Sequence, residues 1–141
     1  MTRRDWTLLT IAAADGEPLT PVQLQKALFL LGQMMPQHLD SAQFYDFQPY
    51  SYGPFDATVY KDAESLSAEG LVHIEVGRWK QYAATSKGMG AADDVRRRAN
   101  ADAVQYLSKV VDWVRSVSFQ ELVKAIYARF PRYREKSIFQ Y

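Results

Sequence analysis

The chain has 141 residues, of which 48% are hydrophobic and 23% charged, a composition typical of one ordinary globular domain. It has no cysteine and only two histidines, which excludes disulfides, thiolate zinc sites and histidine-rich metal sites. The net charge is +1, but residues 1–95 carry seven Lys/Arg against twelve Asp/Glu, and residues 96–141 carry ten against four. Either the two halves contact each other, or another copy of the chain, so that their charges cancel, or the split marks an electrostatic partner site.

The sequence carries no signal for a membrane or for secretion. Its longest apolar stretch, residues 27–31, is far shorter than the roughly 20 residues that span a bilayer. Asp5 falls where a signal peptide would place its apolar core. We therefore expect a cytoplasmic protein without a membrane segment.

Two helices are predicted at the start of the chain. Apolar residues at helical spacing predict a first helix over residues 5–14. A second helix should begin with Thr20 as a hydroxyl cap, Pro21 at the first helical position and Gln23 reaching back from the third. Because proline disrupts helices, this second helix should end at Pro36.

The middle of the chain is predicted to contain a strand, a helix and a hairpin. Aromatic and polar residues alternate over residues 43–48, which predicts a short strand. A third helix is predicted over residues 54–70, with proline at its first position and glycine at its end. Two further strands, over residues 71–76 and 79–84, should form a hairpin around a glycine.

The last third is predicted to hold two helices and a tail. A long fourth helix should cover residues 91–117, and the two glycines of residues 85–90 mark either a linker or the entry to that helix. Ser118 and Glu121 form a capping box, so a fifth helix should begin there and stop at Pro131. Residues 131–141 are basic and aromatic and form the tail.

This order of elements predicts a mostly helical α+β fold. Helix, helix, strand, helix and a two-stranded hairpin follow one another in a winged-helix-like domain, with the third helix in the recognition position. We expect a single domain in which residues 1–84 form the winged-helix-like core, residues 91–130 form a C-terminal helical pair, and the tail follows.

Two segments resemble motifs of a family of small bacterial proteins. Residues 24–31 read LQKALFLL, which is similar to the LQKLVYLL helix of the YwgA-like proteins. Residues 47–55 read FQPYSYGPF, which resembles their F-x-x-Y-x-Y-G-P-F/Y-S turn and a related turn of the Panacea antitoxin domain. The chain departs from the family at Asp56, where serine or threonine is usual. The resemblance implies a winged-helix-like regulatory or antitoxin-type module from a mobile-element or phage-defence setting, without catalytic residues.

No arrangement of residues in the sequence predicts catalysis. Asp62 and Glu64 are two residues apart, so on a helix they face different directions. His73 falls within an alternating strand, where it is expected to pack or to form a hydrogen bond. The glycines of residues 88–90 lack the preceding strand and the spacing of a phosphate loop. We therefore predict no enzymatic activity, no catalytic residue, no metal and no cofactor.

The first candidate site is the aromatic segment around the Tyr-Gly-Pro-Phe turn, which we expect to bind a protein partner. Aromatic side chains provide a large contact area together with a polar group. The alternative is that these side chains only fix the turn and fill the core. The candidate residues are Tyr50, Tyr52, Gly53, Pro54, Phe55 and Tyr60.

The second candidate site would contact nucleic acid or an acidic partner. Its residues lie at the predicted hairpin tip and in one basic run: Arg78, Trp79, Lys80, Arg96, Arg97 and Arg98. The basic run is either a solvated helix face or a phosphate site. The predicted third helix has four acidic residues against one lysine, so phosphates would repel it from the major groove.

These observations favour protein–protein binding by a regulatory or antitoxin-type module, with a toxin or defence effector as the kind of partner implied. The alternative function is that of a winged-helix DNA-binding transcriptional regulator, with weak DNA affinity. We also consider a homodimer formed through the two C-terminal helices.

Overall fold

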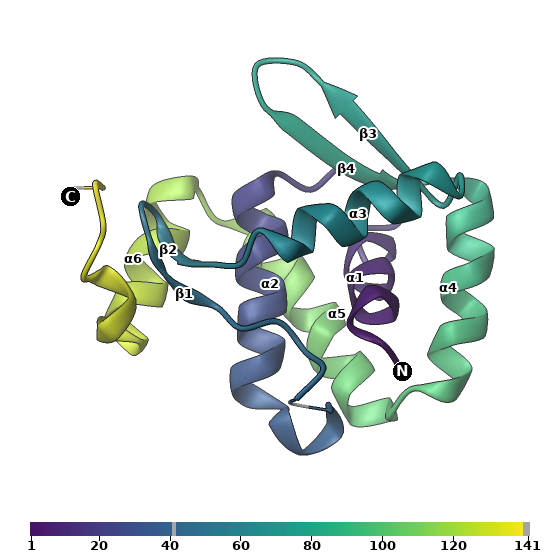
Figure 1. The fold of residues 1–141 in the computed structure, drawn as a ribbon, viewed down its shortest axis with the longest axis horizontal. Helices are drawn as coiled ribbons and strands as arrows, with labels where there is room; N and C mark the ends of the chain where they lie inside the picture. The colour runs from purple at the N-terminus through teal and green to yellow at the C-terminus, as the bar shows by residue number, and fades with distance from the viewer. Residues whose placement is uncertain (41, 140–141) are drawn as a thin grey trace.

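The computed structural model describes residues 1–40 and 42–139 (Figure 1). These residues form an α+β fold that is mostly helical, with six α-helices and two antiparallel two-stranded sheets. In chain order the elements are α1 (Arg3–Ala12), α2 (Pro21–Met34), η1 (Pro36–His38), β1 (Gln48–Tyr50), β2 (Gly53–Phe55), α3 (Thr58–Ala68), β3 (Val72–Val76), β4 (Lys80–Ala84), α4 (Ser86–Arg98), α5 (Ala101–Ser116), α6 (Phe119–Arg129) and η2 (Pro131–Arg134).

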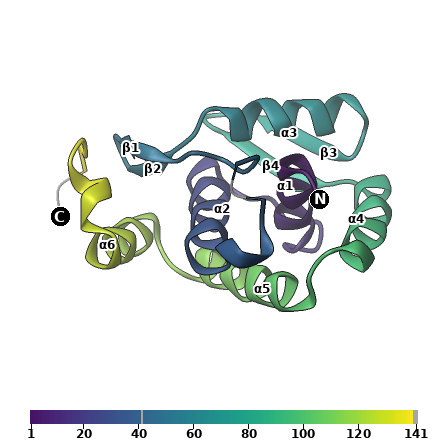
Figure 2. The same ribbon diagram turned by 60° about the horizontal axis from the view of Figure 1, so that its bottom comes forward.

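Helix α1 is the centre of the core. Every residue from Trp6 to Ala12 is buried, so the helix has no solvated face over this length. It packs against α2, α3, α4, α5 and β4, which surround it (Figure 2). Its buried Thr10 hydroxyl donates to the Trp6 carbonyl at 2.7 Å, which satisfies a polar group that burial would otherwise leave without a partner.

Side-chain caps determine where α2 and α6 begin, as the sequence predicts. Thr20 accepts a hydrogen bond from the backbone N–H of Gln23, whose side chain accepts one from the N–H of Thr20. Ser118 and Glu121 form the same capping box at α6. The two predicted helix starts are confirmed because each depends on contacts within four residues of the chain.

The predicted hairpin is confirmed, with β3 and β4 joined by residues 77–79 and Val76 opposite Lys80. A further contact ties it to the helices. Leu19, in the connection between α1 and α2, forms an antiparallel bridge with Tyr82 of β4, with N···O distances of 2.8 and 2.9 Å. The connection therefore extends the hairpin by a single bridge.

The prediction for residues 43–48 and for the start of the third helix is wrong. The strand is β1, at Gln48–Tyr50, and it pairs with β2, so that Tyr50 lies opposite Gly53. Pro54 lies in β2 instead of opening a helix, and α3 begins only at Thr58. Gln25 and Lys26 of α2 form hydrogen bonds with Asp56 and Pro54 and so hold the chain before α3 extended. Local sequence patterns do not reveal such contacts between distant parts of the chain.

The single long fourth helix is also wrong. Asn100 accepts a hydrogen bond from the N–H of Ala103 at 3.0 Å and starts α5, so the chain breaks between α4 and α5. Of the two alternatives for residues 85–90, the helix entry is confirmed, because α4 begins at Ser86 and Thr85 caps it. A Cβ at Gly88 would lie 1.8 Å from the carbonyl oxygen of Leu71, so glycine permits this close approach.

Replacing Leu28 with alanine should destabilise the fold strongly, because Leu28 lies fully buried on α2. Removing a buried leucine leaves a cavity, and we expect a loss of about 2–5 kcal/mol in the free energy of unfolding. Urea denaturation followed by circular dichroism measures the loss. The control is Val76→Ala on β3, where 75% of the residue is exposed and a change below about 0.5 kcal/mol is expected. Equal effects of the two substitutions would contradict this assignment of the core.

Candidate functional site

Two polar side chains of α2 hold the aromatic turn in place. The side chain of Gln25 accepts from the backbone N–H of Asp56 at 3.1 Å and donates to its carbonyl at 2.9 Å. The ammonium of Lys26 donates to the carbonyl of Pro54 at 3.1 Å. Both side chains are buried, so the two motifs that carry the family resemblance contact each other directly.

Asp56 connects this turn to its neighbours on both sides. One carboxylate oxygen accepts from the N–H of Thr58 in the first turn of α3, and the other accepts from the N–H of Asp46, each at 2.9 Å. A carboxylate near a helix start satisfies N–H groups that lack a partner within the helix. Asp56, at which the sequence departs from the motif that it resembles, therefore caps the start of α3.

Burial of Lys26 changes its acidity. The residue is 3% exposed, and removal of the ammonium from water lowers the pKa of Lys26 to about 7. Among the residues that the structure describes, Lys26 makes no ion pair, and Pro54 provides its hydrogen-bond acceptor. Lys26 is thus divided between the charged and neutral forms near neutral pH.

The predicted partner-binding residues lie together but differ in exposure. Tyr50 and Tyr52 are 55% and 41% exposed, whereas Gly53 and Pro54 are buried. Tyr50 stacks on Phe55 with ring centroids 4.8 Å apart. Phe55 in turn contacts Tyr60 edge to face at 5.8 Å. These rings connect the surface to the interior, so Tyr50 and Tyr52 are the members available to a partner.

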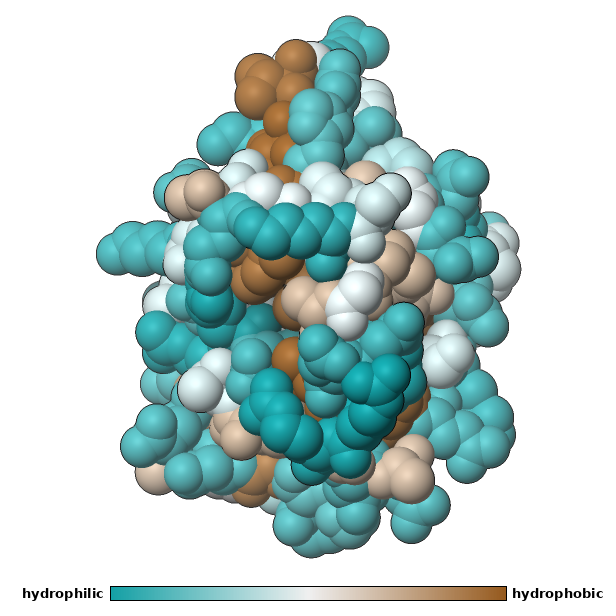
Figure 3. Space-filling model, turned by 90° about the vertical axis from the view of Figure 1, so that its right-hand side faces the viewer, coloured by the Kyte–Doolittle hydropathy of each residue, from teal (hydrophilic) through white to brown (hydrophobic). Residues whose placement is uncertain are grey.

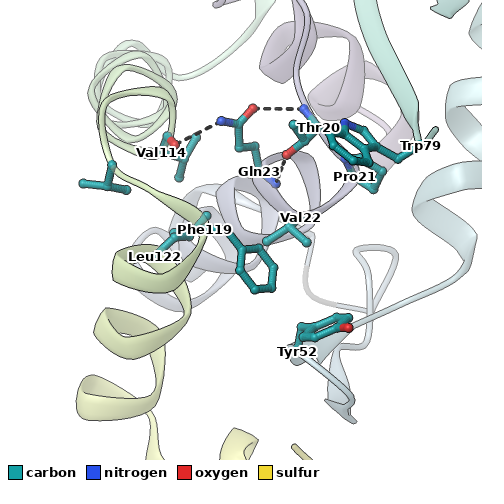
Figure 4. A pocket seen from close by; sticks show the side chains of 10 residues that line it. Thr20, Pro21, Val22, Gln23, Tyr52, Trp79, Val114, Phe119 and Leu122 are labelled. Atoms are coloured by element: carbon teal, nitrogen blue, oxygen red, sulfur yellow. Dashed lines mark hydrogen bonds between the residues drawn. The ribbon is translucent and has the colours of Figure 1, made fainter. Parts of the chain in front are cut away.

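An apolar groove of about 420 Å³ opens beside this turn (Figure 4). It lies between the start of α2, the β1–β2 turn, the tip of the β3–β4 hairpin and the α5–α6 junction. We call it the aromatic groove; its main apolar side chains are Pro21, Val22, Tyr52, Trp79, Phe119 and Leu122. The structure thus brings Trp79, predicted as a hairpin-tip contact for nucleic acid or an acidic partner, to the groove that Tyr52 also lines.

The predicted basic residues do not form one surface. Arg78 and Lys80 lie at the hairpin, whereas the three arginines lie at the C-terminal end of α4, away from both hairpins (Figures 1 and 2). Arg96 pairs with Asp93, and Arg97 pairs with Asp94 at 2.5 Å. The α4 side of the molecule is mostly hydrophilic (Figure 3). This arrangement favours a solvated helix face, since exposed i, i+3 pairs are usual on such faces.

The acidic residues near α3 have basic partners. Asp62 binds Arg3 at 3.1 Å and accepts from the Tyr45 hydroxyl at 2.5 Å. Burial, followed by this hydrogen bond, raises the pKa of Tyr45 well above its usual range. The expected charge excess is also smaller, because α3 spans only Thr58–Ala68 and the acidic Glu69, just beyond it, pairs with Arg4.

Among the described residues, the ion pairs do not link the acidic part of the chain to the basic part, apart from two pairs within α4. The pairs of Asp62 and Glu69 with α1, and the contact of Glu64 with Lys80 at 3.9 Å, all join residues before position 96. The pairs that cross this position are the sequence neighbours within α4. Among the described residues, the interpretation in which the two halves cancel through mutual contacts is therefore not supported.

Sequence reasoning missed Gln25 and Lys26 as site residues. In the sequence, these two polar residues stand out only as part of the LQKALFLL motif. The available signal was a polar pair within the apolar run of residues 24–31. Phe119 was also not among the predicted site residues, yet it is 43% exposed and lines the aromatic groove.

Two properties are absent from the part of the chain that the structure describes. No cluster of three or more potential metal-ligating side chains occurs in it. None of its helices combines the length and the apolar character that crossing a bilayer requires. Comparison of the chain with protein-family models gave no match, and comparison with curated proteins gave none either.

Replacing Gly53 with alanine should destabilise the turn, because Gly53 has φ +106° and a Cβ would lie 3.3 Å from the ring of Tyr127. We expect a loss of about 1–3 kcal/mol in the free energy of unfolding from backbone strain, increased by this contact. Gly16→Ala is the matched control, since Gly16 also has a positive φ of +87° but no atom within 4 Å of the added Cβ. Urea denaturation of both variants compares them, and a loss at Gly53 no larger than at Gly16 would contradict the packing argument.

Proposed function

We propose that the chain is a non-catalytic regulatory or antitoxin-type module that binds a protein partner through the aromatic groove. The observation that supports this function best is the groove itself, where exposed Tyr52, Trp79 and Phe119 surround an apolar cavity. Tyrosine and tryptophan dominate binding energy at protein interfaces because they bury a large area with little loss of side-chain freedom. An exposed groove of this kind is typical of an interaction site.

A winged-helix-like arrangement is proposed for residues 1–84. Two features support it: a helix, α3, followed directly by the β3–β4 hairpin, and the bridge from Leu19 to Tyr82 that links the hairpin to the connection before α2. The β1–β2 hairpin is an insertion between α2 and α3 in this arrangement. It supplies Tyr52 to the groove.

The antitoxin-type role and the mobile-element or phage-defence setting are proposed from the sequence resemblance. Its two motifs are the LQK segment of α2 and the YGPF turn. Gln25 and Lys26 bind Asp56 and Pro54, so the two motifs form one structural unit beside the groove. Such a unit provides a fixed platform on which the aromatic residues are presented.

Tyr52→Ala and Trp79→Ala should each weaken partner binding at least about tenfold, because each removes an aromatic side chain from the groove. Products of neighbouring genes are purified and titrated against the protein by isothermal calorimetry, and the variants are then compared against the identified partner. Thermal melts should be nearly unchanged, since both side chains are about half exposed.

Val76→Ala serves as the control for this titration, because Val76 is exposed on the same hairpin but does not line the groove. Partner binding that survives both groove substitutions would remove the aromatic groove as the site. Light scattering of the free protein gives its mass and therefore tests the proposed homodimer.

DNA binding is the second candidate function, and one observation favours it. Arg78 and Lys80 are exposed on the hairpin, and Asp62 and Glu69 near α3 are paired with arginines of α1, which reduces the repulsion of phosphates. Even with these acids paired, α3 has no excess of positive charge that would attract the phosphate backbone of DNA. We therefore rank this function below protein binding.

DNA affinity should be weak, steeply salt-dependent and similar for unrelated sequences, since phosphate contacts carry no sequence information. Fluorescence anisotropy with two unrelated duplexes at several salt concentrations measures it, and Arg78→Ala with Lys80→Ala should lower the salt slope by about 2. Tight binding to one sequence at physiological salt, lost on Lys61→Ala or Thr58→Ala in α3, would reverse the ranking of the two functions.

A further inference from the structure

A second cavity, of about 300 Å³, lies directly against Lys26. We call it the lysine pocket; its walls include Lys26, Tyr50, Phe55, Tyr60 and Ile138. It adjoins the aromatic groove, since Pro21, Val22 and Tyr52 line both. The tail closes one side, where the N–H of Ile138 donates to the carbonyl of Ser51 at 3.0 Å.

We propose that the lysine pocket binds a small organic carboxylate with an apolar body, with the carboxylate paired to Lys26 and the body against the rings of Tyr50 and Phe55. The lysine pocket shares one wall with the aromatic groove but differs from it in containing Lys26.

The described residues do not use the full hydrogen-bonding capacity of Lys26. A lysine ammonium carries three donors, and the described structure provides one acceptor for them, the carbonyl of Pro54. The residue is 3% exposed, so bulk water does not fully solvate the other two. A buried charge without a counter-ion is unfavourable, and a carboxylate oxygen would supply both the charge and the missing acceptors.

The electrostatic environment of Lys26 in the pocket is formed by neutral groups. The titratable groups that face Lys26 are Tyr50, Tyr52 and Tyr60 in the pocket walls and Tyr127 of α6, whose ring lies beside Gly53. No aspartate, glutamate or second cation lines the pocket in the described residues. Burial alone accounts for the lowered pKa of Lys26, about 7, so no anion among the described residues competes for the amine.

The charge and the size of the lysine pocket determine which ligand it suits. The pocket supplies a single cation and no arginine fork, which suits a monovalent carboxylate better than a phosphate that needs several strong donors. Its volume of about 300 Å³ is at the small end for ligand sites. An aromatic or branched aliphatic body matches the flanking rings.

The test uses 3-phenylpropionate as probe and 3-phenylpropanamide as its uncharged control, titrated into the unaltered protein by calorimetry or by NMR. Carboxylate binding requires the charged form of Lys26, and the charged fraction falls as the pH rises through about 7. The affinity for 3-phenylpropionate should therefore be about 30-fold lower at pH 8.5 than at pH 6, because the ammonium fraction falls by that factor. The amide should show no such dependence. Equal, pH-independent binding of both probes, or no binding at millimolar concentration, would overturn the proposal.

A variant pair gives an independent readout. Lys26→Met retains an apolar chain of similar length and should weaken 3-phenylpropionate binding at least about tenfold, while amide binding stays the same. Lys61→Met removes an exposed lysine of α3 and should leave both unchanged. Undiminished carboxylate binding to Lys26→Met would overturn the assignment of Lys26. The probe pair on the unaltered protein decides the proposal even where Lys26→Met fails to fold.

The same chemistry can come from a free small molecule or from the C-terminus of a protein. A third titration separates the two sources. It uses an N-acetylated dipeptide that ends in phenylalanine, once with a free C-terminal carboxylate and once with a C-terminal amide. Tighter binding of the free-acid peptide than of 3-phenylpropionate assigns the pocket to a chain terminus, and weaker binding assigns it to a small molecule. Because no protein partner is present, the outcome does not depend on whether the aromatic groove binds one.

Discussion

The contact of Gln25 and Lys26 with the turn before α3 is the interaction on which the site depends. It joins a polar pair in the middle of an apolar helix to the backbone of Pro54 and Asp56. A buried amide that loses its partners destabilises a fold by about 1–3 kcal/mol, so the extended turn and the inward-facing pair require each other. With the turn held extended, Tyr50 and Tyr52 project outward, and α3 starts four residues later than local signals indicate.

The burial of Lys26 makes the stability of the fold depend on pH. The folded-state pKa of Lys26, about 7, lies below its ordinary value of 10.5, so between these pH values the unfolded chain binds more protons and stability rises with pH. Below about pH 7 the cost of the buried ammonium is fully present. One hydrogen bond to the carbonyl of Pro54 offsets only part of the free energy needed to bury the ammonium. This imbalance favours a role of Lys26 in addition to holding the turn.

How much could be predicted from the sequence depended on the range of the interaction responsible. Capping boxes at Thr20 and Ser118 act within four residues, and the β3–β4 hairpin depends on a short connection, so these elements were predicted correctly. The start of α3 was predicted wrongly because Gln25, about thirty residues away, decides it. The aromatic residues of the site were predicted, but the groove was not. Its walls come from four separate parts of the chain, whose meeting only the tertiary structure reveals.

The aromatic groove and the lysine pocket share Pro21, Val22 and Tyr52, and this overlap has an energetic consequence. Tyr52 also contacts Phe119 edge to face at 5.2 Å, and Phe119 contacts Phe139 of the tail at 5.4 Å. A carboxylate in the pocket and a partner in the groove would therefore meet at one exposed ring. If the ligand changes the affinity for the partner through that ring, linkage requires that the partner change the affinity for the ligand by the same factor. Under the two proposals together, Tyr52 is the residue through which occupancy of one site would be communicated to the other.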